Sequence, residues 1–491
     1  MKKNLSKLFA MALALIMALA LTVPAFAAEQ KGTITVNNAT NEKNYVIYRI
    51  FDLKLVEGTT GETAKVSYTI ADKWTGFFAN GQKGAQYIVA EEGSLTNQIV
   101  VDGQTKWINI TDDNVAKFAQ DALDYALKHS IANDGAKVAA DNTVIFNDLP
   151  LGYYMVYPEG ATDITTGNSS ICSLTSTVPD ATVTPKADYP TIDKEVSDAE
   201  VEYGQVVEYT ITGKVPDTTG YQDYTYTVND TMSGLTLTGE YDVKIGGTSI
   251  KESSNISGTV PAADATSFEM TIDVMEYQTQ VGADIVITYK AKVDADAVQI
   301  GPDGNANNAT LVYSNKPGET TSSVPEKVKV YTCQITIDKV DGADSSKKLS
   351  GAVFALMNSD GEYYKLTNGV VSWVTIDDAT YEKIVAEATT VITGENGAAE
   401  FKGIEAGSYQ LVEIKAPQGY NLLTTPKDVT IASDGEHAHV TATATVENNT
   451  GSVLPSTGGM GTTLFYTIGG VLVVAAGVLL VTKKRMNNME G

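Results

Sequence analysis

The chain has 491 residues, and its 60 Asp and Glu residues outnumber its 35 Lys and Arg residues, which leaves a net charge of −25. So acidic a surface repels polyanions, which argues against a nucleic-acid partner and fits a soluble exported protein. The two cysteines, Cys172 and Cys333, are too few for the disulfide framework that stabilises small secreted domains. A whole predicted domain separates them, so both are expected to be free thiols.

Residues 1–27 are predicted to form an export signal. Three lysines precede an apolar stretch over residues 8–21, and the small-residue pattern Ala-Phe-Ala follows at 25–27. This combination is typical of a secretory signal peptide. The mature chain is therefore expected to begin at Ala28 and to leave the cytoplasm.

Residues 28–186 are predicted to form the first domain. Apolar residues recur at helical spacing over residues 115–127, which predicts one helix in this domain. Thr111, Asp112 and Asp113 are its N-cap candidates. Prolines punctuate the segment that ends the domain and mark a boundary there.

Residues 187–328 are predicted to form the middle domain. The stretches VVEYTITGKV, FEMTIDV and DIVITYKAKV alternate β-branched or aromatic residues with polar ones, and Gly, Asp and Asn turns separate them. Alternation of this kind predicts half-buried strands. The chain is therefore expected to be mainly β and to consist of tandem Ig-like β-sandwich domains.

Residues 329–450 are predicted to form the third domain, with a short helix over residues 379–388. A faint internal repeat relates this domain to the first. FNDLPLGYYMV at residues 146–156 overlays FKGIEAGSYQLV from Phe401, with Phe, an aliphatic residue, Gly, Tyr and an aliphatic residue in matching places. The two domains are therefore expected to share a sandwich type.

Residues 451–491 contain a short peptide, an apolar run and a basic tail. The run over residues 462–482 has no charged side chain and is long enough to cross about 30 Å of hydrocarbon as a helix. Lys483, Lys484 and Arg485 come directly after it, which places the tail in the cytoplasm and the preceding chain outside. The sequence thus predicts a C-terminal transmembrane helix on an exported protein.

The peptide before this run reads Leu-Pro-Ser-Thr-Gly. With the run and the basic tail it resembles the cell-wall sorting signal of Gram-positive surface proteins, whose residues here are Leu454, Pro455, Ser456, Thr457 and Gly458. Pro455 fixes an extended, kinked backbone, and Gly458 leaves the Thr457 carbonyl unshielded. The resemblance implies that a sortase cysteine attacks this carbonyl, releases the chain from Gly458 onward, and holds the remainder as an acyl-enzyme until an amine resolves it.

A candidate for that amine lies at the end of the first domain. The segment ATVTPK, residues 181–186, resembles the pilin motif of sortase-assembled pilins, in which a Lys after Pro is the nucleophile. The resemblance implies this role for Lys186. Thr184 departs from the commonest form of the motif, which has an aromatic residue before the Pro-Lys pair.

In the third domain, YQLVEIKAPQGY at residues 409–420 resembles the pilin E-box at every defining position. That pattern belongs to Cna protein B-type domains, in which a Lys of the first strand and an Asn of the last join in a spontaneous isopeptide bond. The resemblance assigns these roles to Lys339 and Asn448, with Glu413 as the acid that shuttles the proton. Strand alternation points Glu413 inward, where burial favours a neutral amine beside a neutral acid.

The middle domain resembles the fimbrial isopeptide-forming D2 domain through PTIDKEV, VNDTMSGLTL and GNANNATLVYSN. The resemblance assigns Lys194 as the nucleophile and Asp230 as the acid. Strand alternation points Asn307 inward with apolar residues, which favours it as the electrophile. The alternatives left open are Glu269 as the acid and Asn308 or Asn315 as the amide.

Other features of the sequence predict no further chemistry. In the first domain, Pro158 stands at the position equivalent to Glu413, so no bond is predicted there. His437 and His439 have metal-like spacing, but no third ligand cluster accompanies them, so no metal or cofactor is predicted. No phosphate loop or nucleophile elbow is visible, so the chain is not expected to be an enzyme acting on an external substrate.

Over its whole length the sequence resembles a backbone, or major, pilin of a Gram-positive pilus. The resemblance implies a secreted, cell-wall-anchored protein that passes through a membrane-anchored state before sortase cleavage. The implied partners are pilin-specific and housekeeping sortases, other copies of the chain, minor pilins, peptidoglycan and a host ligand. The alternatives are a monomeric sortase-anchored adhesin and a minor subunit at the base or tip of the fibre.

Overall fold

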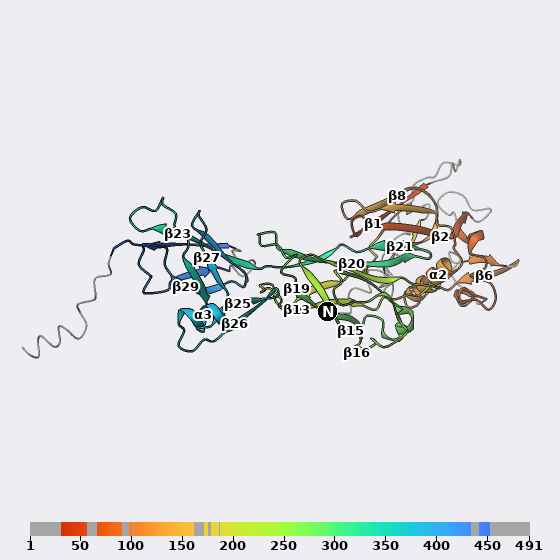
Figure 1. Ribbon diagram of the computed structural model, residues 1–491. Helices are drawn as coiled ribbons and strands as arrows, with labels where there is room; N and C mark the ends of the chain where they lie inside the picture. The colour runs from red at the N-terminus through yellow and green to blue at the C-terminus, as the bar shows by residue number, and fades with distance from the viewer. Residues whose placement is uncertain are drawn as a thin grey trace, which may run out of the picture. The chain divides into compact units, whose positions relative to one another are not determined.

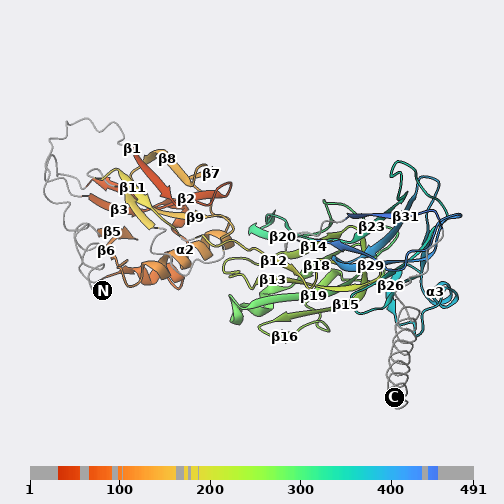
Figure 2. The same ribbon diagram turned by 90° about the vertical axis from the view of Figure 1, so that its left-hand side faces the viewer.

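The computed structural model describes residues 31–55, 66–90, 98–101, 103–161, 171–174, 178–185, 187–433 and 441–451. Within them it separates two compact units, whose strands are labelled in Figures 1 and 2. The first unit holds the chain up to Ala199 with Val206–Val298 and Asn305–Val330, and the second holds Glu200–Gln205, Gln299–Gly304 and the chain from Tyr331. No helix of the described residues is both long and apolar enough to span a bilayer. The predicted signal peptide, sorting peptide and transmembrane run lie outside them.

A three-stranded sheet in the first unit has β1 (Lys31–Asn37) at its centre. β8 (Thr143–Pro150) pairs with β1 in the antiparallel sense, and β11 (Asp180–Val183) pairs with it in the parallel sense. β1 and β8 lie side by side in both views (Figures 1 and 2). The alternation of β1 buries Ile34 and Val36 completely in the core.

A larger sheet has the order β10-β9-β2-β3-β5-β6-β4, with β7 paired to β2. Its strands are β2 (Asn44–Leu55), β3 (Val66–Ile70), β4 (Ile88–Val89), β5 (Gln98–Val101), β6 (Gln104–Ile108), β7 (Gly135–Val138), β9 (Gly152–Pro158) and β10 (Ile171–Leu174). The predicted helix is α2 (Val115–Lys128), which buries Phe118 fully; two 3-10 turns, Asp72–Trp74 and Lys83–Tyr87, precede it. Its N-cap position is held by Asn114, one residue beyond the candidates taken from the sequence.

The remainder of the first unit forms two further sheets. One has the order β12-β13-β19-β15-β16, and the other has the order β17-β18-β14-β20-β21 with β22 paired to β20. Their strands are β12 (Asp193–Val196), β13 (Val206–Lys214), β14 (Tyr226–Met232), β15 (Leu235–Ile245), β16 (Thr248–Ser249), β17 (Ile256–Thr259), β18 (Ser267–Ile272), β19 (Asp284–Val293), β20 (Asn305–Lys316), β21 (Glu319–Ser322) and β22 (Glu326–Val330). A 3-10 segment, Val274–Gln280, connects β18 to β19. Buried and less buried residues alternate along β13, β19 and β20, as the sequence predicts.

The second unit contains a three-stranded sheet of order β28-β23-β31 and a sheet of order β26-β25-β24-β29-β30 with β27 paired to β24. Its elements are β23 (Cys333–Asp341), β24 (Val353–Met357), β25 (Tyr363–Thr367), β26 (Val370–Val374), α3 (Tyr381–Glu387), β27 (Thr390–Ile392), β28 (Ala398–Ile404), β29 (Gly407–Lys415), β30 (Lys427–Ile431) and β31 (Thr441–Asn448). The short predicted helix corresponds to α3. The prediction of a mainly β fold with tandem Ig-like domains is confirmed.

The two three-stranded sheets have the same topology. In each, the first strand lies between an antiparallel neighbour and the last strand, which runs parallel to it. Ile34 pairs with Phe146 as Ile335 pairs with Phe401, and the two phenylalanines are the residues that the sequence repeat overlays. The register therefore supports the relation between the first and third domains that the repeat indicates.

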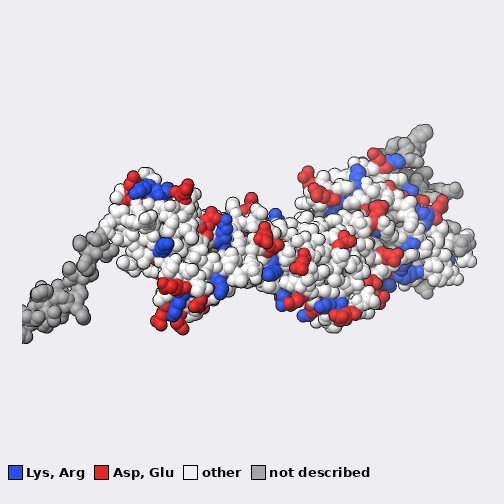
Figure 3. All heavy atoms as spheres, in the orientation of Figure 1, with Lys and Arg blue, Asp and Glu red and all other residues white. Residues whose placement is uncertain are grey.

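Acidic and basic side chains are intermixed on the face of the molecule shown in Figure 3. On that face the negative charge is spread over the surface instead of forming one continuous acidic area. On this face the charge therefore forms a solvated surface in which basic residues interrupt the acidic ones.

Candidate functional site

The first candidate site lies between the two sheets that contain β12 and β20. Lys194 comes from β12, while Asp230 on β14 and Asn307 on β20 come from the opposite sheet. Asp230 and Asn307 are fully buried and Lys194 is 5% exposed. Strand alternation brings all three side chains into the space between the sheets. For Asn307 the sequence indicates this inward position.

A tyrosine hydroxyl joins these three groups. Lys194 Nζ pairs with Asp230 Oδ2 and also donates a hydrogen bond to Tyr289 Oη at 2.6 Å. Tyr289 donates to Asp230 Oδ2 at 2.8 Å, and Asn307 Nδ2 donates to Tyr289 Oη at 2.9 Å. Sequence reasoning missed Tyr289, although the alternation of β19 marks it as an inward residue.

Apolar and aromatic walls set the electrostatics of this site. The Tyr209 ring stacks on Tyr289 at 5.4 Å between centroids, and the Phe268 ring meets Tyr289 edge-on at 5.1 Å. Burial lowers the pKa of the Lys194 amine and raises that of the Asp230 carboxyl, and the attraction between the two groups does not cancel either shift. The environment therefore favours the neutral amine beside the neutral acid, in which the amine has a free lone pair.

The alternatives for this site lie elsewhere on the strands. Glu269 is exposed on β18, while Asn308 and Asn315 are only partly buried on β20. Asn307 is the asparagine whose side chain contacts Tyr289 beside the amine. The geometry thus favours the set Lys194, Asp230 and Asn307.

The second candidate site lies in the second unit. Lys339 on β23 and Asn448 on β31 belong to neighbouring parallel strands, whose register pairs Lys339 with Val446 and Asp341 with Asn448. Glu413 enters from β29 of the other sheet. Lys339 is 0% exposed, Asn448 1% and Glu413 5%. The amine and the amide thus share one sheet here, whereas in the first site they come from opposite sheets.

Backbone groups hold the second site in place. Lys339 Nζ donates to Val446 O at 2.8 Å, and Asn448 Nδ2 donates to Glu413 Oε2 at 2.9 Å and to Asn421 O at 2.6 Å. The Leu423 N–H donates to the same Glu413 oxygen at 2.9 Å. Burial lowers the pKa of Lys339 to about 8, which favours the neutral amine.

The turn that follows Glu413 explains the second half of the E-box pattern. The Tyr420 N–H donates to Pro417 O at 3.1 Å, and the Tyr420 hydroxyl donates to Asp341 Oδ2 at 2.7 Å. This turn brings Asn421 O and the Leu423 N–H against the buried side chains. The sequence did not indicate the Asn421 carbonyl or the Leu423 N–H, because every residue type carries these backbone groups.

In both sites, one oxygen of the acid and the oxygen of the asparagine amide lack a hydrogen-bond partner within the described part of the chain. One carboxyl oxygen and the amide oxygen have no hydrogen bond among the described residues; these atoms are Asp230 Oδ1, Asn307 Oδ1, Glu413 Oε1 and Asn448 Oδ1. A buried polar atom without a partner is costly, typically by about 1–3 kcal/mol. A protonated carboxyl that donates to the amide oxygen would use both atoms and would polarise the amide carbonyl.

At the positions equivalent to Lys339 and Glu413, the first domain carries other residue types. The register of the two three-stranded sheets places Asn38 at the position of Lys339, and the sequence repeat places Pro158 at that of Glu413. Neither side chain supplies an amine or an acid. That no bond forms in this domain stays a prediction.

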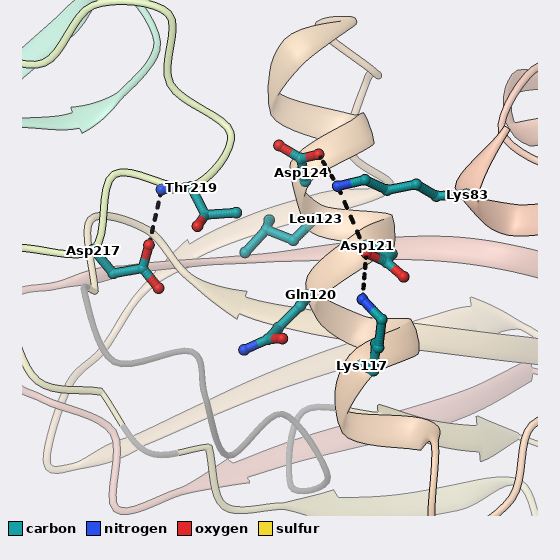
Figure 4. A pocket seen from close by; sticks show the side chains of 8 residues that line it. All are labelled: Lys83, Lys117, Gln120, Asp121, Leu123, Asp124, Asp217 and Thr219. Carbon is teal, nitrogen blue, oxygen red and sulfur yellow. Dashed lines mark hydrogen bonds and ion pairs between the residues drawn. The ribbon is translucent and has the colours of Figure 1, made fainter. Parts of the chain in front are cut away.

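A cavity of about 200 Å³ beside α2 is lined by paired charges (Figure 4). Lys83 Nζ lies 3.0 Å from Asp124 Oδ2, and Lys117 Nζ lies 3.3 Å from Asp121 Oδ1. The Tyr87 hydroxyl also donates to Asp121. These acids are therefore neutralised by basic residues of the chain, and the cluster stabilises the α2 region.

Several predicted functional residues fall outside the described part of the chain. Lys186 lies there, three residues beyond the end of β11, together with the sorting peptide. His437 and His439, for which no metal is predicted, lie there as well. Nothing is described of the Cys172 side chain. Cys333 is a buried free thiol, and burial raises its pKa to about 12, so it is unreactive.

Residues 333–446 match the SpaA family, a prealbumin-like fold domain, and residues 446–488 match the LPXTG cell wall anchor motif. The chain thus contains one region that matches a SpaA domain and a C-terminal region that matches the LPXTG anchor motif. The SpaA match begins at the first residue of β23 and includes Lys339 and Glu413, and the LPXTG match includes the predicted sorting signal. The predicted cell-wall location is thus confirmed.

Two curated relatives share part of this chain. The trypsin-resistant surface T6 protein of Streptococcus pyogenes serotype M6 is 29% identical over 267 residues, covering 49% of this chain and 44% of that protein. Fimbrial subunit type 1 of Actinomyces viscosus is 29% identical over 231 residues, covering 40% of this chain and 42% of that protein. The chain thus spans less than half the length of either relative.

Among solved structures, the pilus 2b backbone protein of group B streptococcus is 29% identical and covers 54% of this chain and 100% of that chain, with a TM-score of 0.43. The family matches and the two curated relatives support the predicted recognition of the chain as a sortase-assembled backbone pilin.

Proposed function

We propose that the chain is the structural backbone subunit of a covalently polymerised cell-surface pilus. A pilin-specific sortase joins Thr457 of one copy to Lys186 of another, and a housekeeping sortase attaches the finished fibre to peptidoglycan. The observation that carries the proposal is the pair of buried Lys, acid and Asn sets in a chain with a sorting signal. Such sets suit a subunit that is stabilised by amide bonds where disulfides are absent.

Within each set, the reaction replaces one amide by another. The lysine Nζ bonds to the asparagine Cγ, the bond from Cγ to Nδ2 breaks, and one proton passes from Nζ to Nδ2, so that ammonia leaves. Asp230 and Glu413 serve as the acids that carry this proton. The chain acts once on itself and has no external substrate.

The mass of the purified chain tests both bonds. We expect the wild-type mass to fall short of the sequence mass by about 34 Da, since each bond releases one ammonia of about 17 Da through acid-assisted transfer. Asp230→Ala and Glu413→Ala should each restore about 17 Da, because each variant removes the acid of one site. Asn308→Ala is the matched control and should keep both bonds. A wild-type chain of full mass would contradict the proposal.

The pKa of Lys339 predicts a pH dependence when its partner is removed. In Asn448→Ala the amine stays free, and its pKa in the folded chain lies near 8 against an ordinary 10.5. Between these values the unfolded chain binds more protons, so the free energy of unfolding should rise with pH, by up to about 1.4 kcal/mol per pH unit. Denaturant titrations from pH 7 to 11 measure this slope. The double variant with Lys339→Met should lack it, and equal slopes in both would refute the lowered pKa.

A further inference from the structure

Among the described residues, the Tyr289 hydroxyl contacts all three reacting groups of the first site. It accepts hydrogen bonds from Lys194 Nζ at 2.6 Å and Asn307 Nδ2 at 2.9 Å, and it donates to Asp230 Oδ2 at 2.8 Å. These two nitrogens are the atoms that lose and gain the proton when ammonia leaves. The hydroxyl therefore lies between the donor and the acceptor of the transferred proton.

We propose that Tyr289 is a catalytic residue that relays the proton from Lys194 to the leaving ammonia, an inference that rests on the proposed bond between Lys194 and Asn307. After Nζ has added to Cγ, the tetrahedral oxygen holds the Asp230 proton and Asp230 is a carboxylate. The surplus proton on Nζ passes to Tyr289 Oη as the tyrosine passes its own proton to Asp230 Oδ2. Asp230 then protonates Nδ2, ammonia leaves, and the oxygen returns its proton to Asp230.

The tyrosine is suited to this role because it remains a hydroxyl. Burial raises the pKa of Tyr289 well above its usual range, so it both accepts and donates a proton without ionising. The Tyr209 and Phe268 rings pack against it and fix the ring in place. Its Oη is thereby held at hydrogen-bond distance from all three groups before the reaction begins.

In the described part of the second site, carbonyl groups and Glu413 take the place of such a hydroxyl. There the amine donates to the carbonyl of Val446, and the amide nitrogen donates to the carbonyl of Asn421 and to Glu413. A carbonyl oxygen accepts a hydrogen bond but has no proton to pass on. The two sites of one chain thus differ in their proton path, and each serves as an internal reference for the other.

The experiment follows both bonds in the same molecules. The full chain is kept in denaturant before either bond forms and is then diluted to refold, and peptide masses report each bond with time. In Tyr289→Phe, the bond between Lys194 and Asn307 should form at least about 100-fold more slowly, the usual scale of general acid–base catalysis. The bond between Lys339 and Asn448 should keep its wild-type rate.

Tyr226→Phe is the matched control. Tyr226 is a buried tyrosine on β14 whose hydroxyl has no hydrogen-bond partner among the described residues, so its loss should leave both rates unchanged. Near-ultraviolet circular dichroism checks that each variant folds. Wild-type kinetics in heavy water give a second measurement, in which the bond at Lys194 should slow by a larger factor than the bond at Lys339, because more protons move at the first site.

The possible results distinguish failure of the relay from failure of the proposed bond. A folded Tyr289→Phe chain that forms the first bond at the wild-type rate overturns the relay and leaves the proposed function intact. If Tyr289→Phe does not fold, equal heavy-water effects at the two wild-type sites overturn the relay, and the larger effect at Lys194 supports it. A wild-type chain that never forms the first bond overturns the relay and the bond in the proposed function together.

Discussion

Replacing Lys186 by alanine is expected to collapse a boiling-resistant ladder of polymers to a single anchored band. The acyl-enzyme at Thr457 needs an amine to resolve it, and the variant removes the proposed amine while the sorting signal remains. Gel electrophoresis of cell-wall extracts measures the effect. Since each added subunit requires one such bond, the loss of polymer should be complete.

Two control variants distinguish the loss of the Lys186 nucleophile from the loss of a positive charge. Lys186→Arg keeps the positive charge, but a guanidinium stays protonated and does not attack, so it should abolish the ladder as well. Lys327→Ala removes an exposed lysine of β22 and should leave the ladder intact. A ladder that persists in Lys186→Ala would reject this nucleophile. A wild-type protein that never forms a ladder would favour the monomeric adhesin.

The position of Lys186 in the sequence defines how tension would pass through such a fibre. Force would enter a subunit at Lys186 and leave at Thr457, so residues 31–185 would lie outside its path. Both proposed internal bonds lie on the path, and none is predicted for the first domain, which has Asn38 and Pro158 at the equivalent positions. The proposed linkage thus accounts for two related domains, of which only the third has a lysine and an acid at these equivalent positions.

The sequence predicts those features of the sites that depend on residues close together in the chain. Alternation along a strand is local, so it indicated that Asn307 and Glu413 face inward, and the structure buries both. The role of Tyr289 depends on side chains from three other strands, and alternation alone marks it only as a core residue. Pairing between distant strands brings these groups together, and a single sequence does not contain that information.

Which segments of the chain make up the second unit was not predictable from the sequence, for the same reason. The segment Glu200–Gln205 belongs to this unit, although the sequence shows no break around it. The Tyr203 N–H donates to Gly403 O at 3.0 Å, and the Val371 N–H donates to Tyr203 O at 2.9 Å. Trp373 Nε1 also donates to Glu202 Oε1 at 2.8 Å. These contacts join residues far apart in the chain, whereas punctuation by proline and glycine reports only local boundaries.

Replacing Asn448 by alanine is expected to lower the thermal midpoint of the second unit by roughly 15–20 °C. The proposed bond closes a loop of about 110 residues, which is worth about 4–5 kcal/mol of unfolded-state entropy. For a unit of this size, each kcal/mol shifts the midpoint by about 4 °C. Calorimetry measures the change. Asn449→Ala, the same substitution at the exposed neighbour, should have little effect, and equal midpoints for the two variants would contradict the bond.

Mechanical extension should separate the same two variants even more clearly. β23 and β31 are the first and last strands of the unit and run parallel, so a bond from Lys339 to Asn448 would pass force directly between them. The chain between the two residues would then stay folded under load. In Asn448→Ala that chain is free to extend by about 3.4 Å per residue, which adds roughly 350 Å of contour length. Single-molecule pulling should show this step in Asn448→Ala and not in Asn449→Ala, because the covalent bond, and not the packing of the sandwich, would limit the extension.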